Sequence, residues 1–227
     1  MKIGAILWAS YVPILTRAAA RVRDLGLEVR IFSSRTLEAH PEKREEALVE
    51  LARADIILLY RSGDSFWEEI LPRLTELGKT RPLVSLGYDP AYLTLSNVSP
   101  EVVQKALRYV LYGGEENFVN LLLYLASALG GLDVSHRDPE SLPLAGIYHP
   151  RAPKVFTDTG EYLAWYRPSP GTPLVGILYS RHNWVNGEME VERALIEEFE
   201  AQGLGVIPVF SYSVKDESLG SEGPGRR

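Results

Sequence analysis

The sequence predicts an α/β protein that begins with a doubly wound parallel sheet. Two observations support this fold class. Short apolar runs alternate along the chain with longer segments in which apolar residues recur at helical spacing. Glycine follows several of the helical segments, as is typical of helix C-termini. Strands that alternate with helices pair in parallel through right-handed crossovers, which place helices on both faces of the sheet.

The first domain is expected to contain four strands. Each is a short apolar run without clean alternation, as suits a strand that is covered on both faces. They are expected at residues 2–9, 27–33, 55–60 and 82–86. Amphipathic helices are expected at residues 11–25, 41–52, 65–77, 99–111 and 115–129. Ser65 is placed as an N-cap with Glu68 three residues on, the spacing of a capping box. This order of elements predicts a Rossmann or flavodoxin-like domain over residues 1–131.

Residues 132–173 differ in composition from the first domain. They contain seven of the chain's 15 prolines, a density that prevents long regular elements. Apolar residues such as Ile147 and Phe156 make the stretch too hydrophobic for a solvated tether. We therefore expect an ordered proline-rich linker with a short helix at residues 159–166, whose three aromatic rings favour core packing over a flat-ligand platform.

A second α/β unit is expected to begin at residue 174. Its elements are a strand, a helix, a strand and a polar, glycine-rich tail, at residues 174–179, 190–201, 206–210 and 218–227. A single strand-helix-strand unit cannot bury both faces of its own sheet. We therefore expect residues 174–227 to form an incomplete domain whose exposed sheet edge tends to associate with another protein surface.

Composition excludes several classes of protein. The formal net charge is -6, which gives no electrostatic support to nucleic-acid binding. The absence of cysteine excludes disulfides, thiolate metal sites and a cysteine nucleophile, and agrees with a reducing compartment. The four histidines lack metal-ligand spacing, and no apolar run approaches the ~18 residues of a membrane span. These observations predict a cytoplasmic protein without a metal site or a membrane span.

Three nucleotide-binding and hydrolase motifs are absent from the sequence. No G-x-G-x-x-G follows the first strand, and there is no G-x-x-x-x-G-K-[ST] or G-x-S-x-G. The chain is therefore not expected to bind a dinucleotide through that fingerprint or to hydrolyse ATP through a P-loop. No catalytic residue can be assigned from the sequence.

Ligands of open α/β sheets bind outside the carboxyl ends of the strands, and two of the loops expected there carry the candidate residues. The loop at residues 180–188 is the richer, with a cation, an imidazole, two amides, an indole and a carboxylate. Its candidate ligand-binding residues are Arg181, His182, Asn183, Asn186 and Glu188. After the third strand the candidates are Arg61 and Asp64.

A structural role is the alternative for each candidate. The loop at residues 180–188 could form a turn that caps backbone groups, or a subunit contact. Arg61 and Asp64 could close a surface turn as an ion pair. His149, which lies beside Pro150, is more often a packed, hydrogen-bonded group than a metal ligand in such a setting.

Two stretches, residues 146–168 and 176–220, resemble a known family. The matching blocks are GIYHPRAPKVF, EYLAWY, VGILYSRHNWVNG and QGLGVIPVFSYSVKDESLG. They are similar to the N-terminal part of the cobaltochelatase large subunit CobN, which is related to the H subunit of magnesium chelatase. The blocks are long and lie in order, whereas residues 1–131 carry no diagnostic motif.

The resemblance implies a part in ATP-dependent insertion of cobalt into a corrin-type tetrapyrrole during cobalamin biosynthesis. It implies that the large subunit holds the macrocycle, that the divalent metal (cobalt or magnesium) is a substrate, and that AAA+ type partner subunits hydrolyse ATP. The family's large subunit is several times longer, so the rest of it is an expected partner and this chain alone is expected to be a truncated, inactive fragment. A stand-alone small-ligand-binding module and an assembly scaffold without catalysis are the alternatives.

Overall fold

The structure, a computed structural model, describes residues 1–213, and the polar tail expected at residues 218–227 lies outside the described residues. The chain divides into two compact units, Met1–Ser141 and Leu142–Arg227. Within residues 1–213, no helix has the length and apolar character needed to cross a membrane.

The first unit is built on a sheet of four parallel strands in the order β2-β1-β3-β4. The strands are β1 (Lys2–Leu7), β2 (Glu28–Ser33), β3 (Ile56–Arg61) and β4 (Leu83–Gly87). Ile3 of β1 lies opposite Val29 on one side and Ile56 on the other. The central strands β1 and β3 are buried along nearly their whole length, as their unbroken apolar runs predict. The predicted doubly wound sheet is therefore confirmed.

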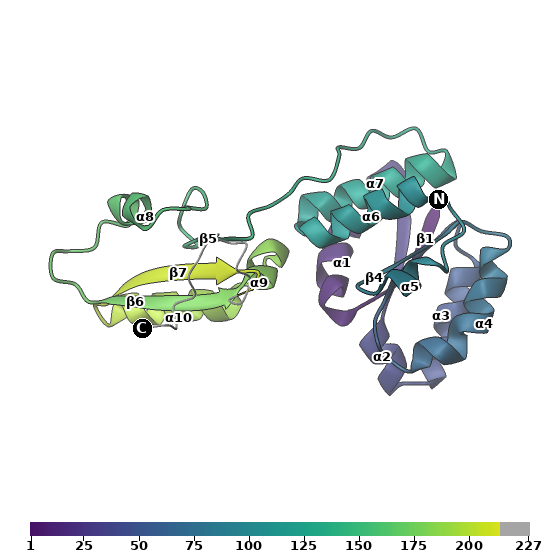
Figure 1. The fold of residues 1–227 in the computed structure, drawn as a ribbon, viewed down its shortest axis with the longest axis horizontal. Coiled ribbons are helices and arrows are strands. Elements are labelled where there is room, and N and C mark those ends of the chain that lie inside the picture. Colours follow the sequence, from purple (N-terminus) through teal and green to yellow (C-terminus); the bar gives the residue numbers. More distant parts are fainter. Residues whose placement is uncertain (214–227) are drawn as a thin grey trace. The chain divides into compact units, whose positions relative to one another are not determined.

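Helices cover both faces of this sheet (Figure 1). On one face lie α1 (Val12–Val22), α6 (Pro100–Tyr112) and α7 (Glu115–Gly130). On the other lie α2 (Ser34–Ala39), α3 (Glu42–Ala52) and α4 (Phe66–Gly78). Shorter helical segments are η1 (Ala9–Tyr11), η2 (Arg23–Leu25) and α5 (Pro90–Leu93). Successive residues of β3 face opposite layers, since Leu58 packs with α1 and α7 whereas Leu59 packs with α3 and α4.

The N-terminus of α4 is capped by a neighbouring helix, and the expected capping box is wrong. Ser65 has helical dihedral angles and makes no side-chain cap. Its hydroxyl instead donates to Oε1 of Glu38 on α2 at 2.7 Å, and the Phe66 N–H donates to Oε2 of the same carboxylate at 2.8 Å. These hydrogen bonds, first that from Ser65 and then that from Phe66, lower the pKa of Glu38. A carboxylate from another helix thus satisfies the backbone donor.

The second unit contains a mixed sheet of three strands in the order β5-β7-β6. The strands are β5 (Ala145–Ile147), β6 (Leu174–Ser180) and β7 (Gly205–Ser211). The helices are α8 (Thr159–Tyr166), α9 (Arg181–Asn186) and α10 (Glu190–Ala201). Strands β6 and β7 pair in parallel, as their expected crossover helix α10 requires, whereas β5 is antiparallel to β7 and was not expected from the sequence.

The boundary between the units differs from the boundaries expected for a linker at residues 132–173. The N–H of Arg137 donates to Oδ1 of Asn120 on α7 at 2.7 Å, which ties this stretch to the first unit. Residues from Leu142 onward belong to the second unit, because β5 joins its sheet and Tyr162 of α8 is completely buried there. The high proline content of residues 132–173 therefore corresponds to chain that is largely irregular but packed against the two units.

Strand β6 is an edge strand of the described sheet and presents apolar side chains to solvent. Leu174 and Leu178 are 44% and 58% exposed. Leu178 lies opposite Val209 of β7 in the register, so the two side chains share one face of the sheet. That face is covered at Val209 and exposed at Leu178. On α10, Val191 and Leu195 are exposed as well. The expected apolar edge is present, and a surface of this kind favours contact with another protein surface.

Candidate functional site

Residues 180–188 are expected as a loop, but Arg181–Asn186 form the helix α9 directly after β6. The Ser180 hydroxyl accepts a hydrogen bond from the His182 N–H at 3.2 Å and so caps the first turn. Gly187 ends the helix with a φ of 70°, a left-handed conformation that glycine adopts without strain. The expectation of a loop was wrong because these two caps stabilise a helix too short to show periodicity.

Arg181, the first residue of α9, ties the end of β6 to the start of the second unit. The side chain is buried. Its Nε donates to the carbonyl oxygen of Pro143 at 2.7 Å, and Nη2 donates to that of Leu142 at 3.2 Å. A buried guanidinium that is bound to backbone carbonyls stabilises the fold. This geometry favours the structural role for Arg181 over ligand binding.

The other candidate residues of this segment contact one another or α10. Nδ2 of Asn186 lies 2.8 Å from Nε2 of His182, and Nδ2 of Asn183 donates to Oε1 of Glu192 at 2.7 Å. Glu188 donates its backbone N–H to the carbonyl oxygen of Asn183 at 2.9 Å. Burial lowers the pKa of His182, which keeps the imidazole neutral at pH 7. The structure brings the candidates together, and many of their polar groups hydrogen-bond to one another or to α10.

Trp184, in the middle of α9, contributes to the core of the second unit. Its indole stacks on Phe210 of β7, with 4.2 Å between the ring centroids and an angle of 13° between the planes. The ring of Tyr148, the residue after β5, lies 6.3 Å from the indole, measured between centroids. The aromatic residue of the expected loop is therefore a packing residue rather than a platform for a ligand.

A second polar cluster lies around Glu200 of α10. Its Oε1 accepts hydrogen bonds from Nη2 of Arg151 at 2.6 Å and from the hydroxyl of Tyr166 at 2.8 Å, and lies 3.3 Å from Nε2 of His149. The Arg151 N–H donates to Nδ1 of His149 at 3.1 Å. His149 is buried beside the rings of Trp165 and Tyr166. The structure therefore agrees with a packed, hydrogen-bonded histidine that joins α8 to α10.

Acid is expected to destabilise the second unit through this cluster. Burial lowers the pKa of His149, and hydrogen bonds from Tyr166 and Arg151 lower the pKa of Glu200 against the opposing effect of its own burial. The unfolded chain therefore takes up protons that the folded chain excludes as the pH falls below about 6.5, and stability is lost. We expect His149→Gln to flatten the dependence of the unfolding free energy on pH between pH 7 and pH 5, measured by urea denaturation.

The exposed His40 on the first unit provides the control for this measurement. His40→Gln should retain the wild-type pH dependence of the second unit. A His149→Gln protein with the same pH dependence as the wild type would show that His149 does not contribute to acid sensitivity.

In the first unit, the end of β3 places Arg61 in an aromatic environment. The side chain is 9% exposed, and its guanidinium carbon lies 4.6 Å from the ring centroid of Tyr92 and 5.9 Å from that of Trp67. Its Nε has no hydrogen-bond partner among residues 1–213. The nearest ion-pair contact joins Nη2 to Oε1 of Glu68 at 3.9 Å, and the Glu68 side chain is 79% exposed.

The expected surface ion pair between Arg61 and Asp64 is wrong. Arg61 is still the last residue of β3 and is buried between aromatic rings rather than at the surface. Asp64 instead accepts a hydrogen bond from the Ser62 hydroxyl at 2.5 Å. The two candidates lie three residues apart, one at the end of β3 and one after it, and their side chains have different partners.

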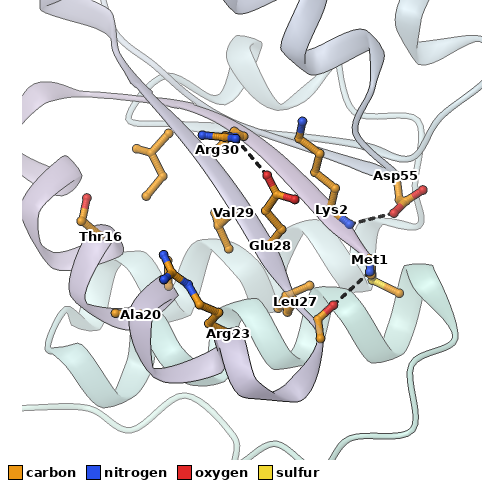
Figure 2. Close-up of a pocket in the computed structure, with 13 residues that line it drawn as sticks. Met1, Lys2, Thr16, Ala20, Arg23, Leu27, Glu28, Val29, Arg30 and Asp55 are labelled. Carbon is orange, nitrogen blue, oxygen red and sulfur yellow. Dashed lines mark hydrogen bonds and ion pairs between the residues drawn. The ribbon is translucent and has the colours of Figure 1, made fainter.

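A depression of about 760 Å³ lies between α1 and β2 (Figure 2). It opens at the amino ends of β1 and β2, away from the carboxyl edge where ligands of this fold bind. Several of its charged side chains have partners, and Nζ of Lys2 contacts Glu50 at 2.7 Å. Arg30 contacts Glu28 at 3.0 Å, and Asp55 accepts the backbone N–H of Lys2 at 2.7 Å (Figure 2). Charge compensation and location give no support to a ligand site there.

No three His, Asp or Glu side chains within residues 1–213 come together in a way that could hold a metal ion. Two arrangements of the described residues remain as candidates: the buried Arg61 guanidinium between aromatic rings, and the polar cluster around Glu200. Sequence reasoning missed Tyr92, Trp67 and Glu200, because each reaches its partner only through the tertiary fold.

The family profile described as CobN/Magnesium Chelatase matches residues 107–223, slightly more than half of the chain. The chain belongs to this family. It is 25% identical to the aerobic cobaltochelatase subunit CobN of Pseudomonas aeruginosa over 215 residues, which cover 92% of the chain and 17% of that protein. It is 35% identical to the magnesium-chelatase subunit ChlH of Oryza sativa subsp. indica over 119 residues, or 47% of the chain and 9% of ChlH.

Two further comparisons cover nearly the whole chain. An uncharacterized protein of Methanocaldococcus jannaschii is 31% identical over 228 residues, or 99% of the chain and 16% of that protein. The catalytic subunit of cobaltochelatase from Mycobacterium tuberculosis has the same fold over 94% of the chain and 16% of its own length, with a TM-score of 0.58 and 19% identity. The CobN-family chain therefore spans less than a fifth of the length of each of these relatives.

Proposed function

We propose that this CobN-family chain acts as the N-terminal portion of a cobaltochelatase-type large subunit. In this role it takes part in ATP-dependent insertion of cobalt into a corrin-type tetrapyrrole. One observation supports cobalt over magnesium. The alignment with CobN of P. aeruginosa covers 92% of the chain and thus most of both units, whereas the alignment with ChlH covers 47%.

The chemistry of the described residues suits a part in holding the macrocycle rather than the metal. Metal insertion requires a metal ion that has lost its water ligands and pyrrole nitrogens that have lost their protons. The chain offers aromatic rings and a buried cation at the carboxyl edge of its first sheet. ATP hydrolysis is assigned to AAA+ type partner subunits, in agreement with the missing P-loop.

An assembly role is the second candidate function. The exposed Leu174 and Leu178 on β6, with Val191 and Leu195 on α10, support it because such side chains favour a protein contact. The surrounding large subunit and the ATPase subunits are the partners that this role requires. Under this alternative the chain would bind those proteins and have no affinity for a tetrapyrrole.

An in-frame deletion of codons 1–227 in the source organism tests the proposed function. We expect the deleted strain to require added cobalamin, and a plasmid that carries the intact gene to restore growth without it. Magnesium tetrapyrrole content, measured in the same strain, should be unchanged. Growth without cobalamin, or a loss of magnesium tetrapyrroles instead, would contradict the assignment to cobalt insertion.

A further inference from the structure

We propose that Arg61 is an anion anchor that binds a carboxylate on the rim of a flat, ring-shaped ligand at the carboxyl edge of the first sheet. The inference rests on the proposed function, because it names the group that would hold an acidic side chain of the tetrapyrrole. It assigns a binding role to one residue of this chain and makes no statement about the metal.

Arg61 lies where ligands of doubly wound sheets bind. The strand order β2-β1-β3-β4 reverses direction between β1 and β3, and ligands of doubly wound sheets bind outside the carboxyl ends of the strands at this point. Arg61 is the last residue of β3. The ring of Tyr11, which follows β1, lies 4.9 Å from the ring of Tyr60 on β3, so the two strand ends meet at this edge.

Within the described part of the chain, the buried guanidinium of Arg61 is incompletely paired and lacks a hydrogen-bond acceptor at Nε. A buried charge is costly unless it is paired and hydrogen-bonded. Arg61 has no partner for Nε among residues 1–213, and Glu68 approaches Nη2 only to 3.9 Å. The faces of Tyr92 and Trp67 stabilise the cation but provide no oxygen acceptor. A planar fork of N–H donors of this kind matches a carboxylate.

The neighbouring carboxylates have other hydrogen-bond partners. Asp64 accepts from the Ser62 hydroxyl at 2.5 Å, and Oδ1 of Asp89 accepts from the Ala91 N–H at 2.8 Å, where it caps α5. Each is engaged in local loop or helix-cap geometry. Within residues 1–213, Arg61 therefore has the single ion-pair contact with the exposed Glu68, and its Nε has no acceptor.

Aromatic rings surround the same edge of the sheet. Trp8 after β1 is 48% exposed, and Tyr88 after β4 is 69% exposed. Trp8 packs edge-on against Tyr11, and Tyr88 packs edge-on against Tyr92, the ring that lies against Arg61. Exposed aromatic faces bind planar conjugated rings, and a buried cation beside them binds the acidic substituent. The combination favours a flat anionic ligand over a simple inorganic anion.

The Nε–H signal of Arg61 in a nitrogen-15 NMR spectrum of the chain tests the proposal. Three probes are titrated: a corrin with free carboxylates, the same corrin as its methyl esters, and inorganic phosphate. We expect the Arg61 signal, assigned through its loss in Arg61→Lys, to shift with the free acid and not with the ester. Arg44 is the internal control, because it is mostly buried near Phe66 but has an ion pair with Glu69.

Affinity measurements provide the second arm of the test. Arg61→Met is expected to weaken binding of the free-acid corrin about tenfold or more, since one charge-assisted contact is lost, whereas Arg44→Met should bind like the wild type. An unshifted Arg61 signal at saturating free acid would overturn the proposal. A shift with phosphate, in a chain that binds no corrin, would support the anion site and reject the tetrapyrrole of the proposed function.

Discussion

Replacement of Tyr162 by alanine is expected to destabilise the second unit by about 3–5 kcal/mol, as for other large aromatic truncations in cores. Tyr162 is completely buried. Its ring lies 5.6 Å from Phe156, 5.8 Å from Trp165 and 5.4 Å from Tyr166, measured between centroids. The substitution would leave a cavity where α8 meets β7.

The hydroxyl of Tyr162 can be separated from its ring. It donates to the carbonyl oxygen of Val206 at 2.7 Å, so Tyr162→Phe should cost about 1–3 kcal/mol. Urea denaturation followed by tryptophan fluorescence measures both variants. Tyr212→Ala, at an exposed position of the same unit, is the control and should change stability by less than about 0.5 kcal/mol. A Tyr162→Ala protein as stable as this control would contradict the packing described for α8.

Substitution of Arg181 by methionine is expected to have the next largest effect, a loss of about 2–3 kcal/mol of stability. The change removes the charge-assisted hydrogen bonds that the buried guanidinium donates to the carbonyl oxygens of Pro143 and Leu142, and it leaves these acceptors without their donor. The methionine side chain retains much of the apolar volume, which isolates the polar loss. The chain segment that leads into β5 should then detach from the end of β6.

Arg193 provides the matched control for this prediction. It is an exposed arginine on α10, and Arg193→Met should leave the urea midpoint within error of the wild type. Unchanged stability of Arg181→Met together with weaker tetrapyrrole binding would reverse the assignment and restore Arg181 as a ligand-binding residue.

The first sheet could be predicted from the sequence because its central strands carry their signal locally. Residues of β1 and β3 are buried on both faces, so each appears as an unbroken apolar run. Helix ends could also be predicted where a glycine with positive φ follows the helix, as at Gly26 with a φ of 77°. Such local signals determine the order of elements, and that order determines the doubly wound topology.

The candidate sites were less predictable because their contacts join distant parts of the chain. The rings around Arg61 belong to Trp67 and Tyr92. Tyr92 is distant from Arg61 in the sequence, so no local pattern predicts their contact. Glu200 meets His149 and Arg151 across about 50 residues of sequence. The sequence suggests a surface turn for Arg61, whereas the fold buries this residue. Glu200 lies in the expected helix at residues 190–201, but its contacts with His149 and Arg151 could not be predicted from that helix alone.

The helix α9 shows a different limit of sequence analysis. Both of its caps, Ser180 and Gly187, were present in the sequence, yet six residues are too few for an apolar stripe to emerge. The polar residues between the caps therefore suggested a binding loop. In the structure the helix anchors Arg181 and stacks Trp184 on Phe210, and both roles depend on strands that are formed elsewhere.

The most direct test of a macrocycle-holding role is a titration of the chain with a corrin and with a porphyrin, followed by tryptophan quenching and by the absorbance of the ligand. The exposed Trp8 lies at the carboxyl edge of the first sheet and provides a local reporter. We predict saturable binding at micromolar concentrations, with the corrin bound more tightly than the porphyrin and with less quenching in Trp8→Phe. The absence of saturable binding by protein that circular dichroism shows to be folded would contradict a macrocycle site in this chain and leave the assembly role.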